Sequence, residues 1–381
     1  MRILIVNTDY PAFLDQFYLG RPEMKASSYV TQMRARNDSL FGTADFYSRA
    51  FTSIGCQACE VHANNDPMQM AWAREHSQHL AGRSLIPPFL KNFAERARRR
   101  IFGRQLDGTL LNILSAQIRH YEPDVVLNHD MYLIPGLKLR QAAGSRALIV
   151  GQIASPVPSH IKLSDYDLLL SSLPNLVAGF RAAGIPAELC RLAFDSQAQK
   201  AASAQQMRYG VVFVGSLSSN HGRRFQLLET LAASCPQFEL WGPRINHVVE
   251  SSPLHAAYKG EAWGADMYSL LGRAAITVNI HIDMAQDHAN NCRLYEATGM
   301  GSLLLTDDQR DLSDIFIPGA EVVTFSSPSE CLTRVQELLQ DEKLRQRIAK
   351  AGQEKTLATH TYVNRASEML EIFTRHGAGI S

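Results

Sequence analysis

The sequence predicts an α/β protein built from two doubly wound parallel sheets, each covered by helices on both faces. Three observations support this class. The chain has 381 residues, a length typical of two domains of about 150 residues or more. Short apolar runs alternate with helical patterns from end to end, which is the order expected of parallel sheets. The alternation stops over the small and polar residues 196–208 and then starts again.

Residues 1–195 are predicted to form the first domain. Strands are predicted where short apolar runs end in polar residues, at 1–7, 58–64, 123–130, 146–155 and 166–172. Helices are predicted between them by apolar residues at helical spacing, at 44–55, 107–120, 137–144 and 173–186.

Residues 196–208 are predicted to be a linker, with a solvated helix as the alternative. The second domain, residues 209–357, repeats the alternation. Its strands are predicted at 211–216, 238–242, 275–281, 302–308 and 321–326, and its helices at 223–234, 267–274, 290–301, 329–341 and 344–360. Residues 358–381 contain a last helix. The cleft between two such domains is the expected ligand site.

The composition excludes several classes of protein. Lys and Arg total 38 against 37 for Asp and Glu, a formal net charge of +1, whereas a dedicated nucleic-acid binder has a basic excess. No apolar run reaches the roughly 20 residues that a membrane helix needs. The first residues are typical of a strand and not of a signal peptide. Six scattered cysteines favour reduced thiols, and therefore a cytoplasmic location.

The stretch 278–308 contains the strongest candidate binding site. A strand leads through a polar loop to a helix that is predicted to start near Asn290 or Asn291. Asparagine is a good N-cap, and the positive end of the helix dipole attracts anions. Arg293 would add a charge beside a diphosphate, and Glu296, three residues on, can accept bonds from ribose hydroxyls. The alternative is an Arg–Glu surface pair at i, i+3 spacing.

This stretch resembles the C-terminal half of GT-B glycosyltransferases, in particular the spore-maturation (CgeB-like) group. The matching residues are Asn291, Arg293, Tyr295, Glu296, Ala297, Gly301, Thr306 and Asp307. With neighbouring segments, the resemblance covers roughly residues 210–375. It implies a GT-B fold that binds a nucleotide-diphosphate sugar of the UDP or dTDP type, with no metal and no further cofactor.

The resemblance also implies an acceptor for the sugar, which can be a glycan, a lipid, a protein or a small molecule. Many retaining GT-B enzymes have a Glu where this chain has His288. We therefore include His288 among the expected donor-binding residues, and retention is not implied. A nucleotide-sugar epimerase or hydrolase, or a non-catalytic nucleotide-sugar-binding protein, would share the architecture.

A second anion site is predicted at the end of strand 211–216. Gly215 and Ser216 end the strand, a polar loop follows, and Arg223 and Arg224 open the next helix. A short Gly/Ser turn allows phosphate to approach the backbone, and Arg binds phosphate bidentately. The alternative is a turn followed by a solvated basic helix start. The sequence does not show which arginine faces the ligand.

Candidates for a catalytic base lie at strand ends in the first domain. Asp9 follows the first strand, and His129 and Asp130 follow strand 123–128. Sugar transfer to a hydroxyl needs a proton acceptor, and His or Asp can serve. Adjacent residues of an extended chain alternate faces, so His129 and Asp130 need not point the same way. His160, on a Pro-rich loop, is a weaker candidate.

The run Ala94–Arg104 is strongly basic. It is predicted to be a solvated helix, an acceptor-binding surface, or a patch, Arg96–Arg104, that contacts anionic lipid on the cytoplasmic face of a membrane. Oligomeric state is not indicated by the sequence.

Overall fold

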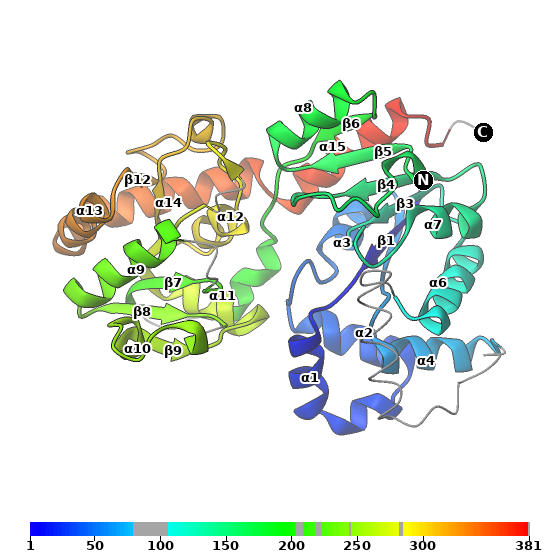
Figure 1. The fold of residues 1–381 in the computed structure, drawn as a ribbon, viewed down its shortest axis with the longest axis horizontal. Helices are drawn as coiled ribbons and strands as arrows, with labels where there is room; N and C mark the ends of the chain where they lie inside the picture. Colours follow the sequence, from blue (N-terminus) through cyan, green and yellow to red (C-terminus); the bar gives the residue numbers. More distant parts are fainter. Residues whose placement is uncertain (79–105, 203–208, 218–221, 244, 282–284, 380–381) are drawn as a thin grey trace. The chain divides into compact units, whose positions relative to one another are not determined.

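The computed structural model describes residues 1–78, 106–202, 209–217, 222–243, 245–281 and 285–379, which divide into two compact units. Unit 1 comprises Met1–Cys190 and Ala366–Ser381, and unit 2 comprises Arg191–Arg365. Each unit contains one wholly parallel sheet with helices packed around it (Figure 1). The predicted fold class, two doubly wound α/β domains, is therefore confirmed.

The sheet of unit 1 has the strand order β2-β1-β3-β4-β5-β6 within the described residues. Its strands are β1 (Arg2–Asn7), β2 (Gln57–His62), β3 (Val125–Asn128), β4 (Leu148–Gln152), β5 (Leu168–Ser171) and β6 (Ala187–Leu189). The order reverses direction at β1, because β2 lies on one side of it and β3 on the other. The crevice at such a reversal, outside the carboxyl ends of the strands, is where ligands bind in this class of fold.

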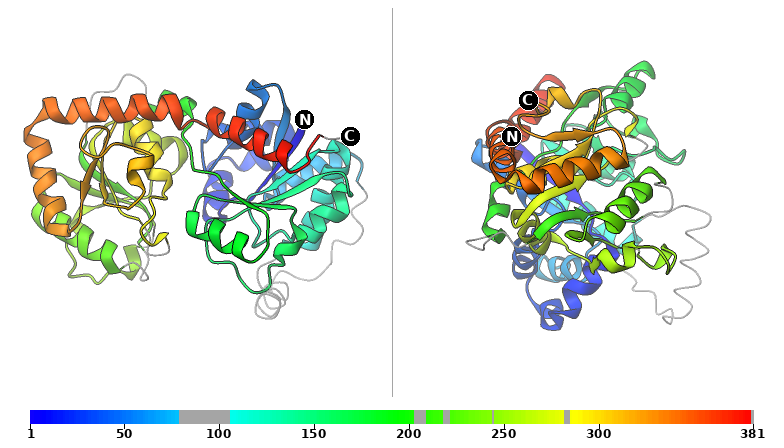
Figure 2. Two further views of the ribbon diagram at one scale, coloured as in Figure 1. Left: turned by 90° about the horizontal axis from the view of Figure 1, so that it is seen from above. Right: turned by 90° about the vertical axis from the view of Figure 1, so that its left-hand side faces the viewer.

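The helices of unit 1 cover both faces of this sheet. They are α1 (Pro11–Leu19), α2 (Tyr29–Asp38), α3 (Phe46–Ser53), α4 (Asp66–Glu75), α6 (Gly108–Tyr121), α7 (Gly136–Ala143), α8 (Pro174–Ala182) and the C-terminal α15 (Tyr362–Arg375). Leu4 and Val6 join the core that α6 and α7 cover. On α3 and α15, the rings of Phe51 and Phe373 stack 6.1 Å apart. The two ends of the chain lie near each other in this unit (Figure 2).

Helix α2 was not predicted, because it has no apolar stripe. It instead buries polar side chains, Gln32 and Arg36. Their partners, Tyr18 and Asp9, come from other elements. The helix depends on tertiary hydrogen bonds and ion pairs, which periodicity in the sequence does not indicate.

The sheet of unit 2 has the order β12-β11-β10-β7-β8-β9 within the described part of the chain. Its strands are β7 (Tyr209–Val214), β8 (Phe238–Trp241), β9 (Tyr258–Gly260), β10 (Ala274–Asn279), β11 (Leu303–Asp307) and β12 (Val323–Phe325). Here the order reverses at β7, which lies between β8 and β10. The crevice between β7 and β10 is therefore the expected ligand site of this unit.

The helices of unit 2 are α9 (Gly222–Ser234), α10 (Leu254–Ala257), α11 (Gly264–Gly272), α12 (Cys292–Gly299), α13 (Pro328–Gln340) and α14 (Glu342–Thr359). Apolar residues of α9 and α13 share a core with Ile276, Val278 and Ile280 of β10 and its end. None of the helices in the described residues is long and apolar enough to cross a membrane.

The segment expected to be a linker is partly folded onto unit 2. Residues Ser196–Ala202 form a 3₁₀ helix that contacts α11, and Ala198 is fully buried. Just before it, Phe194 packs so closely on Gly299 that a Cβ there would lie 2.4 Å from its ring. The chain passes from unit 1 to unit 2 after Cys190, and returns after Arg365. The remaining linker residues, 203–208, lie outside the described residues.

Gly242 is required by the close approach of β7 and β8 at their carboxyl ends. Its φ is +146°, and a Cβ there would lie 2.0 Å from the carbonyl oxygen of Gly215. An L-residue with a side chain would clash and would strain the backbone. The glycine thus allows the end of β7, where a ligand site was predicted, to lie directly against the end of β8.

Candidate functional site

The N-terminus of α12 is formed as the sequence predicts. Asn291 is the N-cap, and its Oδ1 accepts a hydrogen bond of 2.8 Å from the backbone N–H of Arg293. Asn290 precedes the cap and is partly exposed. Asn291 thus fixes the start of α12, and the positive end of the helix dipole, which attracts anions, lies there.

Arg293 and Glu296 form an ion pair that is largely buried. Arg293 Nη1 donates to Glu296 Oε2 over 2.7 Å, and the two side chains are 12% and 15% exposed. The alternative of a solvated surface pair does not describe this geometry. The pair therefore holds a guanidinium and a carboxylate in fixed positions at the start of α12.

Arg293 also connects α12 to the switch point of the sheet. Its Nη2 donates to the carbonyl oxygen of Val214, the last residue of β7, over 3.2 Å. Its buried Nε has no hydrogen-bond partner among the described residues. Glu296 Oε1 lies 3.5 Å from the hydroxyl of Tyr268 on α11. Burial, together with the charge of Glu296, raises the pKa of Tyr268, so the phenol stays protonated and can donate.

The two arginines that open α9 have different surroundings. Arg224 is buried, and it donates to the carbonyl oxygens of Ser216 over 3.0 Å and Ile280 over 3.2 Å. These carbonyls follow β7 and β10, so Arg224 ties together the two sides of the crevice. Arg223 is exposed. Gly215 and Ser216 were predicted to end the strand, but β7 ends at Val214 and they follow it directly. Residues 218–221 of the loop lie outside the described residues.

His288 is held by Asp311 in the loop before α12. Its Nδ1 lies 3.0 Å from Asp311 Oδ2, and its Nε2 accepts from Arg310 Nη2 over 3.2 Å. The other oxygen of Asp311 accepts from the backbone N–H of Ala289. Both ring nitrogens of His288 are thus engaged within the protein, and its visible role is to fix the loop that leads to Asn290 and Asn291.

His281, which follows β10, was not predicted from the sequence as a site residue. Its Nδ1 lies 2.7 Å from Asp307 Oδ1 at the end of β11. The sequence does contain a pattern that could have indicated it. Polar residues occur at every second position of β10 and its end, at Thr277, Asn279 and His281, although the strand is buried throughout. Apolar residues alone would be expected on both faces of such a strand.

Unit 1 has a cavity of about 700 Å³ at its own switch point. Its lining residues follow the carboxyl ends of neighbouring strands, and they are Thr8, Asp9, Tyr10, Pro11, Asn64, Leu106, Asp107, Asp130, Tyr132, Leu133 and His160. Two of the three predicted base candidates, Asp9 and Asp130, are thus brought together with His160. The cavity offers several hydroxyl, phenol and carboxylate groups, which suits a polar ligand.

The carboxylate of Asp9 is engaged in a buried ion pair. Arg36 Nη2 lies 2.5 Å from Asp9 Oδ1, and the Asp9 side chain is fully buried. His62 Nδ1 lies 3.3 Å from the same oxygen. Burial alone would raise the pKa of Asp9, but His62 and Arg36 outweigh it and hold this pKa well below its usual range. Such a carboxylate is a poor proton acceptor, and its evident role is to anchor α2.

His129 and Asp130 point in different directions. His129 does not line the cavity, and its Nδ1 lies 2.7 Å from Asn7 Oδ1. Burial lowers the pKa of His129 to about 4. Asp130 lines the cavity, but it accepts from the Thr8 hydroxyl and from two backbone N–H groups, those of Tyr132 and Leu133. It therefore shapes the loop after β3 as well as facing the cavity.

His160 is exposed at the same cavity. It comes from the loop after β4. Tyr132 also lines this cavity, and its hydroxyl lies 2.7 Å from that of Ser155, which fixes the ring by a hydrogen bond. Of the imidazoles in the described residues that were considered as bases, His160 is the one that lies at the cavity.

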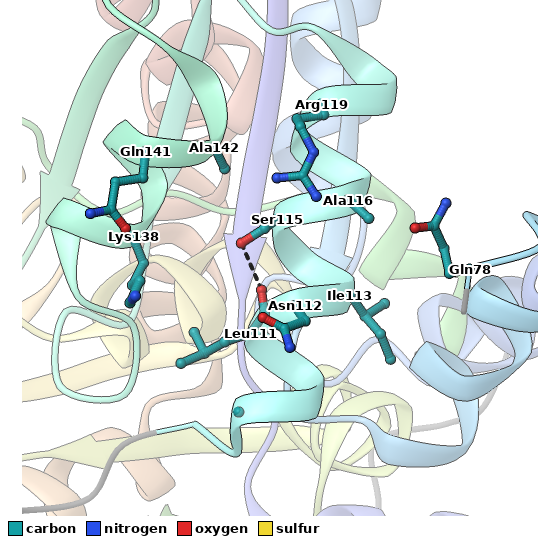
Figure 3. Close-up of a pocket in the computed structure, with 11 residues that line it drawn as sticks. Gln78, Leu111, Asn112, Ile113, Ser115, Ala116, Arg119, Lys138, Gln141 and Ala142 are labelled. Carbon is teal, nitrogen blue, oxygen red and sulfur yellow. Dashed lines mark hydrogen bonds between the residues drawn. The ribbon is translucent and has the colours of Figure 1, made fainter. Parts of the chain in front are cut away.

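A second cavity, of about 570 Å³, lies beside α6 and α7 and away from the strand ends (Figure 3). Polar side chains line it, among them Arg119 of α6 and Lys138 of α7. It contains no residue of the predicted site. The basic run that includes Arg96–Arg104 lies outside the described residues.

Two doubly wound parallel sheets in one chain, each with polar groups at its switch point, define the GT-B class of fold. Solved structures of that fold align with nearly the whole chain. HepE from Anabaena, determined in complex with UDP-glucose, has a TM-score of 0.59 and 12% identity, over 98% of this chain and 100% of its own. A sucrose-phosphate synthase from Thermosynechococcus elongatus has a TM-score of 0.57 and 13% identity, over 98% of both chains. AviGT4, a glycosyltransferase involved in avilamycin A biosynthesis, has a TM-score of 0.53 and 13% identity, over 100% of this chain and 98% of its own.

A sequence comparison matches part of the chain to a family model. Residues 223–371 match the family described as glycosyl transferase-like. This segment includes α9 and α12, and thus Arg224, Arg293 and Glu296. The predicted resemblance to GT-B glycosyltransferases is confirmed, although the matches do not single out the spore-maturation group. No curated protein matches the sequence.

Proposed function

We propose that this protein is a glycosyltransferase that moves a sugar from a UDP or dTDP donor to an acceptor hydroxyl. The observation that carries the proposal is the buried Arg293–Glu296 pair at the start of α12, beside the switch point of unit 2. In this proposal the diphosphate binds at the N-terminus of α12, and Glu296 Oε1 accepts a bond from the ribose. The complex of HepE with UDP-glucose, a protein of the same fold, supports the choice of ligand class.

The chemistry that these groups can provide is stabilisation of the leaving diphosphate. Negative charge develops on the diphosphate as the bond to the sugar breaks. The positive end of α12 and the guanidinium of Arg293 are fixed before the reaction, so little reorganisation is needed when that charge appears. We propose on this basis that transfer needs no metal ion.

A chelation experiment tests metal independence. Transfer by protein treated with EDTA and then desalted is expected to match that of untreated protein. Full loss of activity that magnesium or manganese restores would show that the diphosphate needs a cation, and that Arg293 and the helix do not suffice.

We assign the acceptor to the cavity of about 700 Å³ in unit 1. The hydroxyl, phenol and carboxylate groups in its lining can bond a hydroxyl-bearing group of a glycan, lipid, protein or small molecule. Of the expected bases, Asp130 faces this cavity, and His160 is an alternative. His129 lies outside the lining and is kept neutral by burial. Replacing it, in His129→Ala, should lower the melting temperature and reduce turnover only as far as the folded fraction falls.

Incubation with a panel of nucleotide sugars tests the proposal. UDP- and dTDP-sugars are supplied with and without mixtures of candidate acceptors, and products are separated by mass spectrometry. Acceptor-dependent transfer supports the proposal. Epimerised sugar, free sugar without acceptor, or binding without turnover would instead identify an epimerase, a hydrolase or a binding protein. Absence of any nucleotide binding would refute the assignment of unit 2.

A further inference from the structure

His281 and Asp307 form a buried dyad at the carboxyl ends of β10 and β11. Asp307 Oδ1 accepts from the backbone N–H of His281 over 3.0 Å and lies 2.7 Å from His281 Nδ1. The two side chains are 1% and 5% exposed. Thr306 and Asp307 belong to the motif on which the sequence resemblance rests.

Asp307 is held rigidly as a carboxylate. Gln309 Nε2 donates to its second oxygen over 2.8 Å. Burial would raise the pKa of Asp307, but the contacts with His281 and the bond from Gln309 lower it overall. An ionised carboxylate only accepts hydrogen bonds, so His281 Nδ1 must carry the proton that it shares with Asp307. In the neutral ring, His281 Nε2 then has a free lone pair.

The lone pair of His281 Nε2 is not used within the part of the chain that the structure describes. This atom is buried and has no hydrogen-bond partner among the described residues. Buried polar atoms are usually paired, and an unpaired one in a folded protein calls for an explanation. His288 provides a contrast, because both of its ring nitrogens have partners.

The ring geometry indicates where His281 Nε2 points. The two nitrogens of an imidazole point in nearly opposite directions, and Nδ1 points toward β11. Nε2 is therefore directed away from Asp307. The neighbour of β10 on the side opposite β11 is β7, and the crevice of the switch point lies between β7 and β10. The carbonyl oxygen of Ile280, the preceding residue, is held at that crevice by Arg224.

The dyad adjoins the face of the sheet on which α12 packs. Ile276 and Val278 point into the core shared with α9 and α13, so Asn279, the last residue of β10, points to the opposite face. Asn279 Nδ2 donates to Thr306 Oγ1 over 3.0 Å, and Thr306 Oγ1 lies 3.3 Å from Asp307 Oδ1. Helix α12 contacts β10 and β11, and its buried residues do not belong to the core of α9 and α13. The dyad is thus joined by hydrogen bonds to side chains on the α12 face of these strands.

We propose that His281 Nε2 accepts a hydrogen bond from a hydroxyl of the donor's sugar, and that Asp307 is the positioning residue that fixes the tautomer. The inference rests on the proposed function, because it needs a nucleotide sugar in the crevice. A lone-pair acceptor selects a hydroxyl over a phosphate oxygen, which offers no proton at neutral pH. His281 would then help to determine which sugar is accepted.

The test compares UDP with UDP-sugars by calorimetry. The probes are UDP, UDP-glucose, UDP-galactose and UDP-N-acetylglucosamine, and the variants are His281→Asn, His281→Gln and Asp307→Asn. In His281→Asn the amide can keep the bond to Asp307, but nothing replaces Nε2. The affinity of that variant for the best-bound UDP-sugar is expected to fall about 3- to 10-fold, the loss of one hydrogen bond, with UDP affinity within about twofold of wild type.

The other two variants distinguish a direct role of His281 in ligand binding from a purely structural role. In His281→Gln the amide oxygen can reach the position of Nε2, so part of the UDP-sugar affinity should return. Asp307→Asn can flip the tautomer of His281, so it should weaken UDP-sugar binding while leaving UDP binding intact. Melting temperatures are measured for all variants. If His281 has only a structural role, its replacement would lower the melting temperature without changing the ratio of UDP-sugar to UDP affinity.

Three results would overturn the inference. The first is wild-type affinity of His281→Asn for the UDP-sugar. The second is an equal loss for UDP and UDP-sugar, which would place His281 against the nucleotide. The third is a wild-type protein that binds none of the four probes. The proposed function is refuted as well if dTDP and dTDP-sugars are not bound either.

Discussion

The buried pair of Arg293 and Glu296 allows a prediction with a worked magnitude. Glu296→Ala removes the partner of a guanidinium that is 12% exposed. Loss of one partner from a fully buried pair costs about 3–5 kcal/mol. Because Arg293 keeps its bond to Val214 and some exposure, we expect a smaller loss of unfolding free energy, about 2–3 kcal/mol.

The same substitution should weaken nucleotide binding. If Glu296 Oε1 accepts from the ribose, its loss costs about 1–3 kcal/mol, a factor of roughly 5 to 150 in the Kd for UDP. Isothermal calorimetry with UDP gives the Kd, and urea denaturation gives the stability. Glu296→Gln, which keeps an acceptor oxygen, is expected to fall between wild type and Glu296→Ala in both measurements.

The chain provides a matched control for this experiment. Arg334 and Glu337 on α13 form a pair of the same residue types and spacing, 3.2 Å apart, but they are 45% and 56% exposed. Glu337→Ala should change stability by less than about 1 kcal/mol and should not change UDP binding. A Kd for UDP within twofold of wild type in folded Glu296→Ala would remove Glu296 from the nucleotide site.

Three further predictions concern other parts of the molecule. Asp9→Asn is expected to lower the unfolding free energy by about 3–5 kcal/mol in urea denaturation, with turnover per folded molecule preserved. Asp130→Asn should instead reduce turnover about 10²–10⁴-fold at unchanged UDP affinity if Asp130 is the base. The reverse pattern would contradict both assignments. Burial lowers the pKa of His360 from 6.5 to about 4. Its contribution to stability is therefore full above pH 6.5 and declines by up to about 3 kcal/mol as the pH falls to 4. Between pH 7.5 and 4.5 the melting temperature should fall less steeply for His360→Gln than for wild type, and equal slopes would refute the assignment. Gly242→Ala should cost at least about 2 kcal/mol because of overlap and backbone strain, whereas Gly222→Ala should cost little, because no atom of the described residues lies within 4 Å of the added Cβ. Similar melting temperatures for the two variants would mean that the close contact at Gly242 is relieved at no cost.

The parts of the fold that depend on local pattern were predictable. Buried parallel strands are apolar runs in the sequence, and the start of α12 follows from the capping preference of Asn291. The pairing of Arg293 with Glu296 follows from helical spacing. These features depend on residues within one turn or one strand of each other.

Features that depend on contacts between distant residues were not predictable. Asp9 is a structural ion-pair partner and not a free base because it contacts Arg36. Arg36 lies on helix α2, whose own formation depends on that contact. Which of two adjacent arginines is buried depends on carbonyl groups at the ends of β7 and β10, which accept from Arg224. The role of Asp307 depends on His281, 26 positions earlier in the chain. In each case the deciding partner is a neighbour in space only.

The return of the chain to unit 1 after Arg365 has a consequence for biosynthesis. Met369 and Phe373 of α15 are fully buried, and Phe373 stacks on Phe51. Until residues 366–379 have been synthesised, the apolar surface that Met369 and Phe373 cover on the α3 side of the first sheet stays exposed. A buried Phe side chain alone covers about 150–250 Å². Unit 2 contains no such late segment. The half of the protein that is translated first is therefore expected to be the last to complete its core, and in the interval it is the half most exposed to aggregation and to chaperones.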